Sequence, residues 1–321
     1  MGKLEREGAW PMGAAQLNAI LNDTVDRHYC RPAVMCGHHE TDFERFDESV
    51  QWLSDDLAAR GVQSRQRVGI CLDGGWEFLL AFHALVRLDT VVVPIDPFDE
   101  ASAVAAGDLD LHFIVSHRGE DCLLEETVEA MCGNEACPMF DVSDEFTLVA
   151  VSEQSPLRIE AGLLLDDVVG YRFWPAAEVA DRIDGLREDL DLDTGACAAI
   201  CGPFSCPSVV FLVLACAASG SCVQVVPSFG DSGTAWDEMA AGEASVVFAP
   251  PLLMHDFVRV ADSAAWGSSR PRMVLPDGEV LPEVILRRRG LRRQPHTDRP
   301  VYEFGWTNGY VRRSAQLRPV S

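Results

Sequence analysis

Residues 67–97 read RVGICLDGGWEFLLAFHALVRLDTVVVPIDP, and this stretch decides the fold. The apolar run Val68 to Leu72 predicts a buried strand, which the turn Asp73-Gly74-Gly75 ends. Apolar residues from Trp76 to Val86 recur at helical spacing, and Val91 to Val93 predicts a second strand. A strand, a helix and a strand in this order form a βαβ unit, in which the two strands are parallel and the helix covers them.

The same alternation extends in both directions from this unit, which predicts an α/β fold with parallel, helix-covered sheets. We expect a boundary between Val151 and Pro175, with residues 1–160 forming one α/β subdomain and residues 161–321 a second. The predicted strands lie at 34–36, 113–115, near 198, and at 223–226, 245–248, 273–275 and 301–304. The predicted helices cover 43–57 and 179–190, or begin at 208, after 251 and at 282, and residues 119–144 are interpreted as helix and loop.

The net charge is strongly negative, because 26 Lys and Arg face 50 Asp and Glu, a formal −24. Such a field repels phosphate backbones and anionic lipids, so we expect neither nucleic acid nor membrane as a partner. Residues 270–321 are the exception, with eleven Arg against five acidic residues, a local +6. The run Arg287 to Arg293 in this part is typical either of a solvated helix end or of a docking site for an acidic partner.

The eleven cysteines form no CxxC pair, which indicates neither a disulfide framework nor a zinc site. We therefore expect a reducing, cytoplasmic environment, and the N-terminus lacks the apolar segment of a secretory signal. Residues 194–230 carry no charge, but their longest apolar run, Val209 to Ala218, is half of the ~20 residues that a membrane span needs.

Several stretches resemble one enzyme family. They are RPAVMCGHHE (31–40), SVQWLSDDLAARGV (49–62), residues 67–97 with their phrase Val93-Pro94-Ile95-Asp96-Pro97, and FIVS (113–116). Together they are similar to the opening of adenylate-forming enzymes, which comprise acyl- and aryl-CoA synthetases, luciferases and the adenylation domains of nonribosomal peptide synthetases. Later pieces keep the order of that family: Gly202-Pro203-Phe204, Pro250-Pro251, MVLPDGEVL (273–281) and Phe304-Gly305-Trp306-Thr307-Asn308.

The resemblance implies two helix-covered, mainly parallel sheets in αβαβα layers, as in the large N-terminal domain of these enzymes. It also implies that the chain is truncated before their β-barrel subdomain and C-terminal lid. Family members turn a carboxylate and ATP into an acyl-adenylate and then pass the acyl group to a thiol. Since an anion attacks a phosphate in this reaction, preorganised donors, a cation and usually Mg²⁺ are needed.

The family's phosphate loop, TSGTTGxPKG, is degenerate here. The matching stretch is residues 160–167, in which only Gly162 survives in register, while Asp166 and Asp167 put negative charge where a triphosphate would bind. The chain contains one lysine, Lys3, which lies far from every family motif. The resemblance therefore implies no intact catalytic residues.

A vestigial nucleotide slot is also implied by the resemblance, and Asn308 stands there in place of a Glu that helps to hold Mg²⁺. A neutral amide is a poorer ligand for a hard dication than a carboxylate, so we expect no metal. Alternatively, Phe304 and Trp306 simply close the core at the end of a strand. The residues assigned to the slot are Asp277, Gly278, Glu279, Phe304, Gly305, Thr307 and Asn308.

The sequence thus predicts a pseudoenzyme of the AMP-binding family with a ligand-binding or protein-interaction role. AMP, ATP, a small carboxylic acid and a partner protein are the candidate ligands, and none is a certain cofactor. Three alternatives remain: an active ligase completed by a separate chain, a scaffold whose pocket is filled, and a gene fragment.

Overall fold

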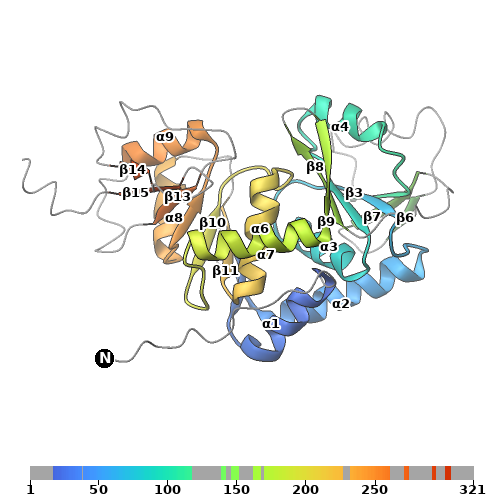
Figure 1. Cartoon of the computed structure of the whole chain (residues 1–321), viewed down its shortest axis with the longest axis horizontal. Helices are drawn as coiled ribbons and strands as arrows, with labels where there is room; N and C mark the ends of the chain where they lie inside the picture. Colours follow the sequence, from blue (N-terminus) through green and yellow to red (C-terminus); the bar gives the residue numbers. More distant parts are fainter. Residues whose placement is uncertain are drawn as a thin grey trace, which may run out of the picture.

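A computed structural model of the chain describes residues 17–37, 39–117, 139–141, 146–151, 162–167, 170–226, 232–260, 271–274, 291–293 and 301–304. These residues form two β-sheets with helices on both faces (Figure 1). In the first sheet the central strands are parallel and the edge strands antiparallel. Its order is β6 (Met139–Asp141), β7 (Phe146–Ala150), β5 (Phe113–His117), β3 (Arg67–Cys71), β4 (Val91–Pro94), β8 (Gly162–Asp167) and β9 (Gly170–Pro175).

The second sheet also has a parallel centre and antiparallel edges. Its order is β14 (Leu291–Arg293), β15 (Val301–Phe304), β13 (Arg272–Val274), β12 (Val246–Phe248), β10 (Cys197–Ile200), β11 (Cys222–Val225), β1 (Pro32–Cys36) and β2 (His39–Asp42).

Each sheet is completed by a hairpin from the part of the chain that forms most of the other sheet. β1 and β2 come from the start of the chain but complete the second sheet, where β1 pairs in parallel with β11. β8 and β9 follow residue 161 but complete the first sheet, where β8 pairs in parallel with β4. Each sheet therefore contains strands from both sides of residue 160, and the expected subdomains 1–160 and 161–321 stay a prediction.

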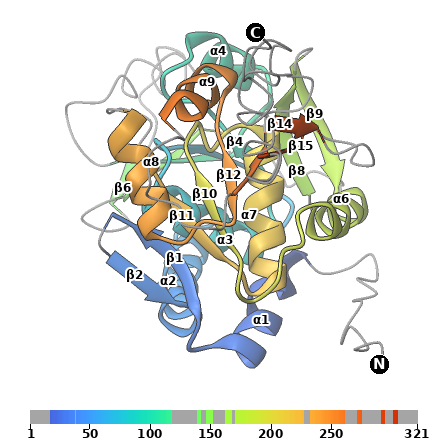
Figure 2. The same ribbon diagram turned by 90° about the vertical axis from the view of Figure 1, so that its left-hand side faces the viewer.

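The helices lie in three layers, so that the layer order is αβαβα. The layer between the sheets contains η1 (Leu17–Ala19), α1 (Ile20–His28), α2 (Phe43–Ala59), α3 (Trp76–Arg87), α6 (Ala176–Asp189) and α7 (Pro207–Ser219). α4 (Glu100–Gly107) covers the outer face of the first sheet, and α8 (Ser232–Ala241) and α9 (Pro251–Val260) cover the outer face of the second. Figure 2 shows α8 in front of the second sheet.

Alternating side chains explain why both faces of each sheet are buried. In β10, Ala198 and Ile200 face the central helices while Cys197 and Ala199 face α8 and α9. α7 is apolar all round, as expected of a helix enclosed by neighbours, and it ends at Gly220, whose φ of +68° favours glycine. Asp42 begins α2 by accepting a hydrogen bond from the amide of Arg45 at 2.9 Å.

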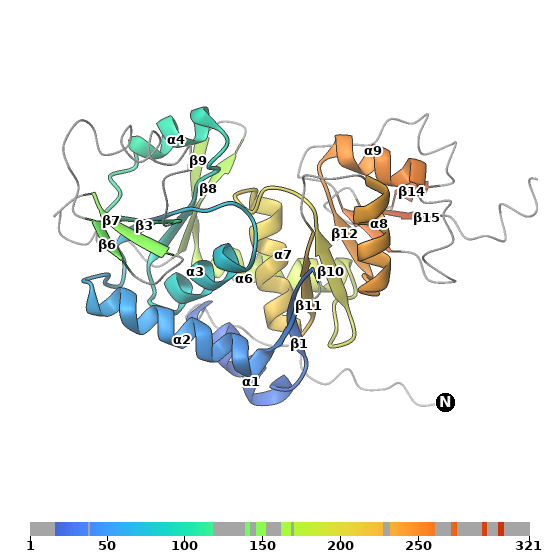
Figure 3. The ribbon, with the colours of Figure 1, turned by 180° about the vertical axis from the view of Figure 1, so that it is seen from behind.

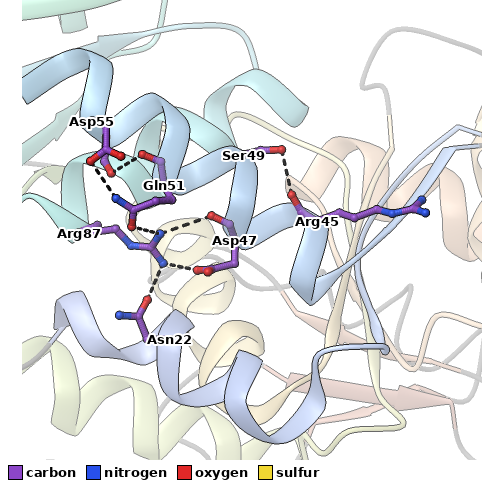
Figure 4. A network of polar contacts seen from close by, with 8 residues as sticks. Asn22, Arg45, Asp47, Ser49, Gln51, Asp55 and Arg87 are labelled. Carbon is purple, nitrogen blue, oxygen red and sulfur yellow. Dashed lines mark hydrogen bonds and ion pairs between the residues drawn. The ribbon is translucent and has the colours of Figure 1, made fainter. Parts of the chain in front are cut away.

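A polar network ties the three helices at the base of the central layer (Figure 4). Arg87 of α3 donates to Asn22 Oδ1 of α1 at 2.6 Å and to Gln51 Oε1 of α2 at 3.2 Å, and it forms an ion pair with Asp47 of α2. Only 11% of the Arg87 side chain is exposed, so these partners offset the free-energy cost of burying its charge.

The predicted α/β class with two helix-covered sheets is confirmed, and the predicted strands and helices within the described residues are present to within a few positions. The sequence patterns missed η1, α1, α4, α8, β2, β6, β7, β14 and the hairpin β8–β9. The predicted helix from 282 lies outside the described residues, as does most of 119–144. The described part of 119–144 is the strand β6, so the interpretation as helix and loop is wrong there.

Candidate functional site at the carboxyl ends of the strands

The parallel strands of both sheets end on the same side of the molecule. α4 follows the carboxyl end of β4 and α9 follows that of β12, and the two helices lie on one side in Figures 1, 2 and 3. α1 and α2 lie on the opposite side. Ligands of open α/β sheets bind at the carboxyl ends of the strands, so this side is the candidate site.

Phe204 joins the two halves of this site. It follows β10, is 3% exposed, and packs on Phe78 of α3 with ring centroids 5.4 Å apart. Gly74, in the turn that precedes α3, lies directly against the Phe204 ring, so a Cβ at this position would overlap it. The Gly202-Pro203-Phe204 segment of the second sheet is therefore fixed on the turn between β3 and α3.

Gly162, Asp166 and Asp167, the residues compared with the family's phosphate loop, all lie in β8. The expectation of a loop conformation is wrong for this stretch, because its backbone pairs residue by residue with β9, from Gly162 with Pro175 to Asp167 with Gly170. Only residues 168 and 169 connect the two strands. Any role of these residues towards phosphate stays a prediction.

The glycine at 162 has a packing explanation. A Cβ there would overlap the carbonyl oxygen of Trp174 and touch the ring of Phe173, so the close pairing of β8 with β9 requires glycine.

Tyr171 anchors the hairpin to the neighbouring elements. Its hydroxyl donates to the carbonyl oxygen of Pro94, at the end of β4, over 3.2 Å, and it lies 3.2 Å from Ser102 Oγ of α4. Burial raises the pKa of Tyr171 to about 12, so the hydroxyl stays protonated and keeps its donor. The signal that could have indicated this hairpin is an apolar run and an aromatic run separated by a short Asp- and Gly-containing break.

The described ends of the first sheet's strands carry mainly negative charge. Asp73 follows β3, Asp96 follows β4, and Asp166 and Asp167 end β8. His117, the last residue of β5, forms a hydrogen-bonded pair with Asp73, and the side chain of the histidine is 29% exposed. Among the described residues, no group of three or more His, Cys, Asp and Glu is arranged to hold a metal ion.

Most of the expected nucleotide slot lies outside the described residues: Asp277, Gly278, Glu279, Gly305, Thr307 and Asn308. Phe304 is the last residue of β15, where its backbone pairs with Leu291. β13 and β15 run antiparallel, so Val274 at the end of β13 pairs with Val301 at the start of β15, and Phe304 lies at the opposite end of the pair. The slot therefore stays a prediction.

Comparisons with known proteins agree with this architecture. Residues 21–166 match the family model of the AMP-binding enzymes. An 81-residue part of the chain is 32% identical to phosphinothricin tripeptide synthetase of Streptomyces viridochromogenes, and this match covers 25% of the chain and 8% of that protein. A polyketide synthase–nonribosomal peptide synthetase of Aspergillus flavipes is 20% identical over 299 residues, which is 87% of the chain and 7% of that protein. The chain thus spans less than a tenth of the length of either relative.

Solved structures show the same fold. A protein of Rhodopseudomonas palustris assigned as a long-chain-fatty-acid CoA ligase superposes with a TM-score of 0.70 at 15% identity, over 86% of this chain and 72% of the other. O-succinylbenzoate CoA synthetase of Bacillus subtilis gives 0.65 at 14% identity, over 86% and 61% of the two chains. The fold and the family match place the chain in the adenylate-forming superfamily, as a relative of its N-terminal part.

Within the part of the chain that the structure describes, no helix combines the length and the apolar character needed to cross a bilayer.

Proposed function

We propose that this chain is a non-catalytic relative of the adenylate-forming ligases, which by itself does not convert a carboxylic acid and ATP into acyl-AMP. Its fold then serves to bind a small ligand or a partner protein. The observation that carries the proposal is the tight hairpin β8–β9, which occupies the stretch compared with the ten-residue phosphate loop.

A triphosphate is held by free backbone N–H groups and cationic side chains. In the hairpin every residue from Gly162 to Asp167 has a partner in β9, so the strand backbone is engaged in the sheet. The connection is two residues long, and Asp166 and Asp167 precede it with negative charge. No lysine follows Lys3 in the sequence. These features oppose phosphate binding both by geometry and by charge.

The direct test is exchange of labelled pyrophosphate into ATP. We expect no exchange above a protein-free blank when the pure chain is supplied with fatty, aryl and amino acids and Mg²⁺. Reproducible exchange by the chain alone would contradict the proposal. Exchange that appears only after a second chain is added would instead support a ligase completed in trans.

A second measurement separates a ligand binder from a filled scaffold. Titration calorimetry with AMP and with ATP should give saturable heat if the adenine side of the site is open. We expect AMP to bind more tightly than ATP, because each added phosphate brings charge towards the carboxylates at the end of β8. Tighter binding of ATP would contradict the placement of those carboxylates at the phosphate side.

A further inference from the structure

Two thiols face each other at the amino end of the second sheet. Cys197 is the first residue of β10 and Cys222 the first of β11, and the two are direct partners in the parallel register. Residues in register on neighbouring strands point to the same face, here the face covered by α8 and α9. The two side chains are therefore adjacent.

The spacing suits a covalent link. Neighbouring strands lie about 4.8 Å apart, within the roughly 4.4–6.8 Å between Cα atoms that a disulfide spans. Rotation about the Cα–Cβ bonds of the two cysteines is the movement that the disulfide then requires.

The backbone at both positions is firmly held. The amide of Cys197 donates to Ser245 Oγ at 3.2 Å, and that hydroxyl donates back to the Cys197 carbonyl oxygen at 3.2 Å. The amide of Cys222 donates to the carbonyl oxygen of Ala196 at 3.0 Å. These bonds keep the strands in register, so the two sulfurs stay opposed while either is modified.

Both residues retain a small contact with solvent, 6% for Cys197 and 7% for Cys222, because they lie at the strand ends. Cys216, near them at the end of α7, is fully buried. The pair is therefore less deeply buried than Cys216.

We propose that Cys197 and Cys222 are a reversible redox site, which a low-molecular-weight disulfide such as oxidised glutathione converts into an intramolecular disulfide. One thiolate attacks the glutathione disulfide, which forms a mixed disulfide and releases one glutathione thiolate. The second thiolate attacks the protein sulfur of that mixed disulfide and releases the other. The protein loses two protons and two electrons, and one oxidised glutathione becomes two reduced glutathiones.

The environment of the pair determines its rate. The hydrogen bond with Cys197, followed by burial, raises the pKa of the Cys222 thiol. Since the thiolate is the attacking species, cross-linking is slower than the reaction of exposed Cys30 and accelerates as the pH rises. The bond closes the chain segment that contains α7 and the Gly202-Pro203-Phe204 turn, so oxidation restricts the unfolded state and raises the unfolding temperature.

Peptide mapping of the full chain tests this site. After incubation with oxidised glutathione at pH 8, free thiols are blocked with iodoacetamide, and the chain is digested with chymotrypsin. Cleavage after Phe204 and Leu214 places Cys197 and Cys222 on different peptides. We expect a linked pair of these peptides, which dithiothreitol separates. Loss of the two free thiols should be equal, and oxidised protein should melt at a higher temperature.

Matched variants identify the partners, because each peptide contains a second cysteine. Cys201→Ser and Cys216→Ser should leave the link intact, whereas Cys222→Ser should abolish it and leave Cys197 reduced or glutathionylated. The wild-type map needs no variant to fold. The proposal is overturned if Cys30 becomes glutathionylated while no linked peptide forms, or if the link joins Cys201 or Cys216 instead.

Discussion

His83 makes the core between the two sheets sensitive to acid. Its ring is 5% exposed on α3 and borders a cavity of about 10 Å³, roughly the space of one water. The other lining residues are mainly apolar and come from β1, α2, α7 and β11. Burial, with Arg87 one turn further along α3, lowers the pKa of His83 to about 3.

The sign of the effect follows from linkage. Above pH 6.5 the ring is neutral in both the folded and the unfolded chain, and His83 causes no pH dependence. Below pH 6.5 the unfolded chain binds a proton that the folded chain excludes down to about pH 3. The free energy of unfolding therefore falls by about 1.4 kcal/mol per pH unit, and by about 2.7 kcal/mol between pH 8 and pH 4.5.

The variant His83→Leu isolates this contribution from that of the carboxylates. Urea unfolding followed by circular dichroism at pH 8 and pH 4.5 gives the acid-induced loss of stability for each protein. We expect the loss to be smaller in His83→Leu by about 2.7 kcal/mol. His39→Leu, at an exposed position of β2, controls for removing one histidine. An acid-induced loss in His83→Leu equal to that of the wild type would refute the reasoning.

Three further predictions concern packing and use the same unfolding assay at pH 7.5. Arg87→Met should destabilise the chain by about 2–4 kcal/mol, since it leaves the partly buried carboxylate of Asp47 unpaired. Arg45→Met, at an exposed side chain, should change stability by less than about 0.5 kcal/mol. Equal effects of the two substitutions would contradict a stabilising role of the Arg87 network. Gly162→Ala should destabilise the chain by about 1–3 kcal/mol, because the added Cβ overlaps β9. Gly185→Ala, in open space within α6, should stabilise the chain by about 0.5–1 kcal/mol. No change in stability for Gly162→Ala would show that β9 can move to make room for the Cβ. Tyr171→Phe should cost about 1 kcal/mol and increase amide exchange in β8 and β9, and unchanged exchange would contradict its anchoring role.

Much of the fold could be predicted because its central strands are buried on both faces. Such strands are continuous apolar runs, as at 68–72 and 91–93, and the longer, mainly apolar stretch between them, residues 76–86, has the length of a helix. The hairpin β8–β9 was missed although its first strand is also an apolar run. Its residues were compared with a loop motif, although the run Gly162 to Leu165 is apolar and none of its four residues has a polar side-chain group to offer a phosphate.

The pairing of distant segments could not be predicted from local pattern. Nothing in residues 32–42 specifies that β1 joins β11 and not β3, because a strand's sequence encodes which faces are buried but not which neighbour supplies the hydrogen bonds. The contact of Phe204 with Gly74 likewise depends on how the two halves pack. For the site, the family resemblance supplied the expected positions, and the structure places Gly162, Asp166 and Asp167 in β8.

The exchange of hairpins has a consequence for assembly. A fragment ending at residue 160 would keep β1 and β2 without their partner β11, and it would lack the strands that cover β4. The complementary fragment would lack β1 and β2, of which β1 pairs with β11, and β4, which pairs with β8. Each fragment would therefore have unpaired strand edges, which favour aggregation. During synthesis, β1 cannot pair with its parallel neighbour β11 until more than half of the chain has been made. Completion of one sheet is therefore coupled to completion of the other.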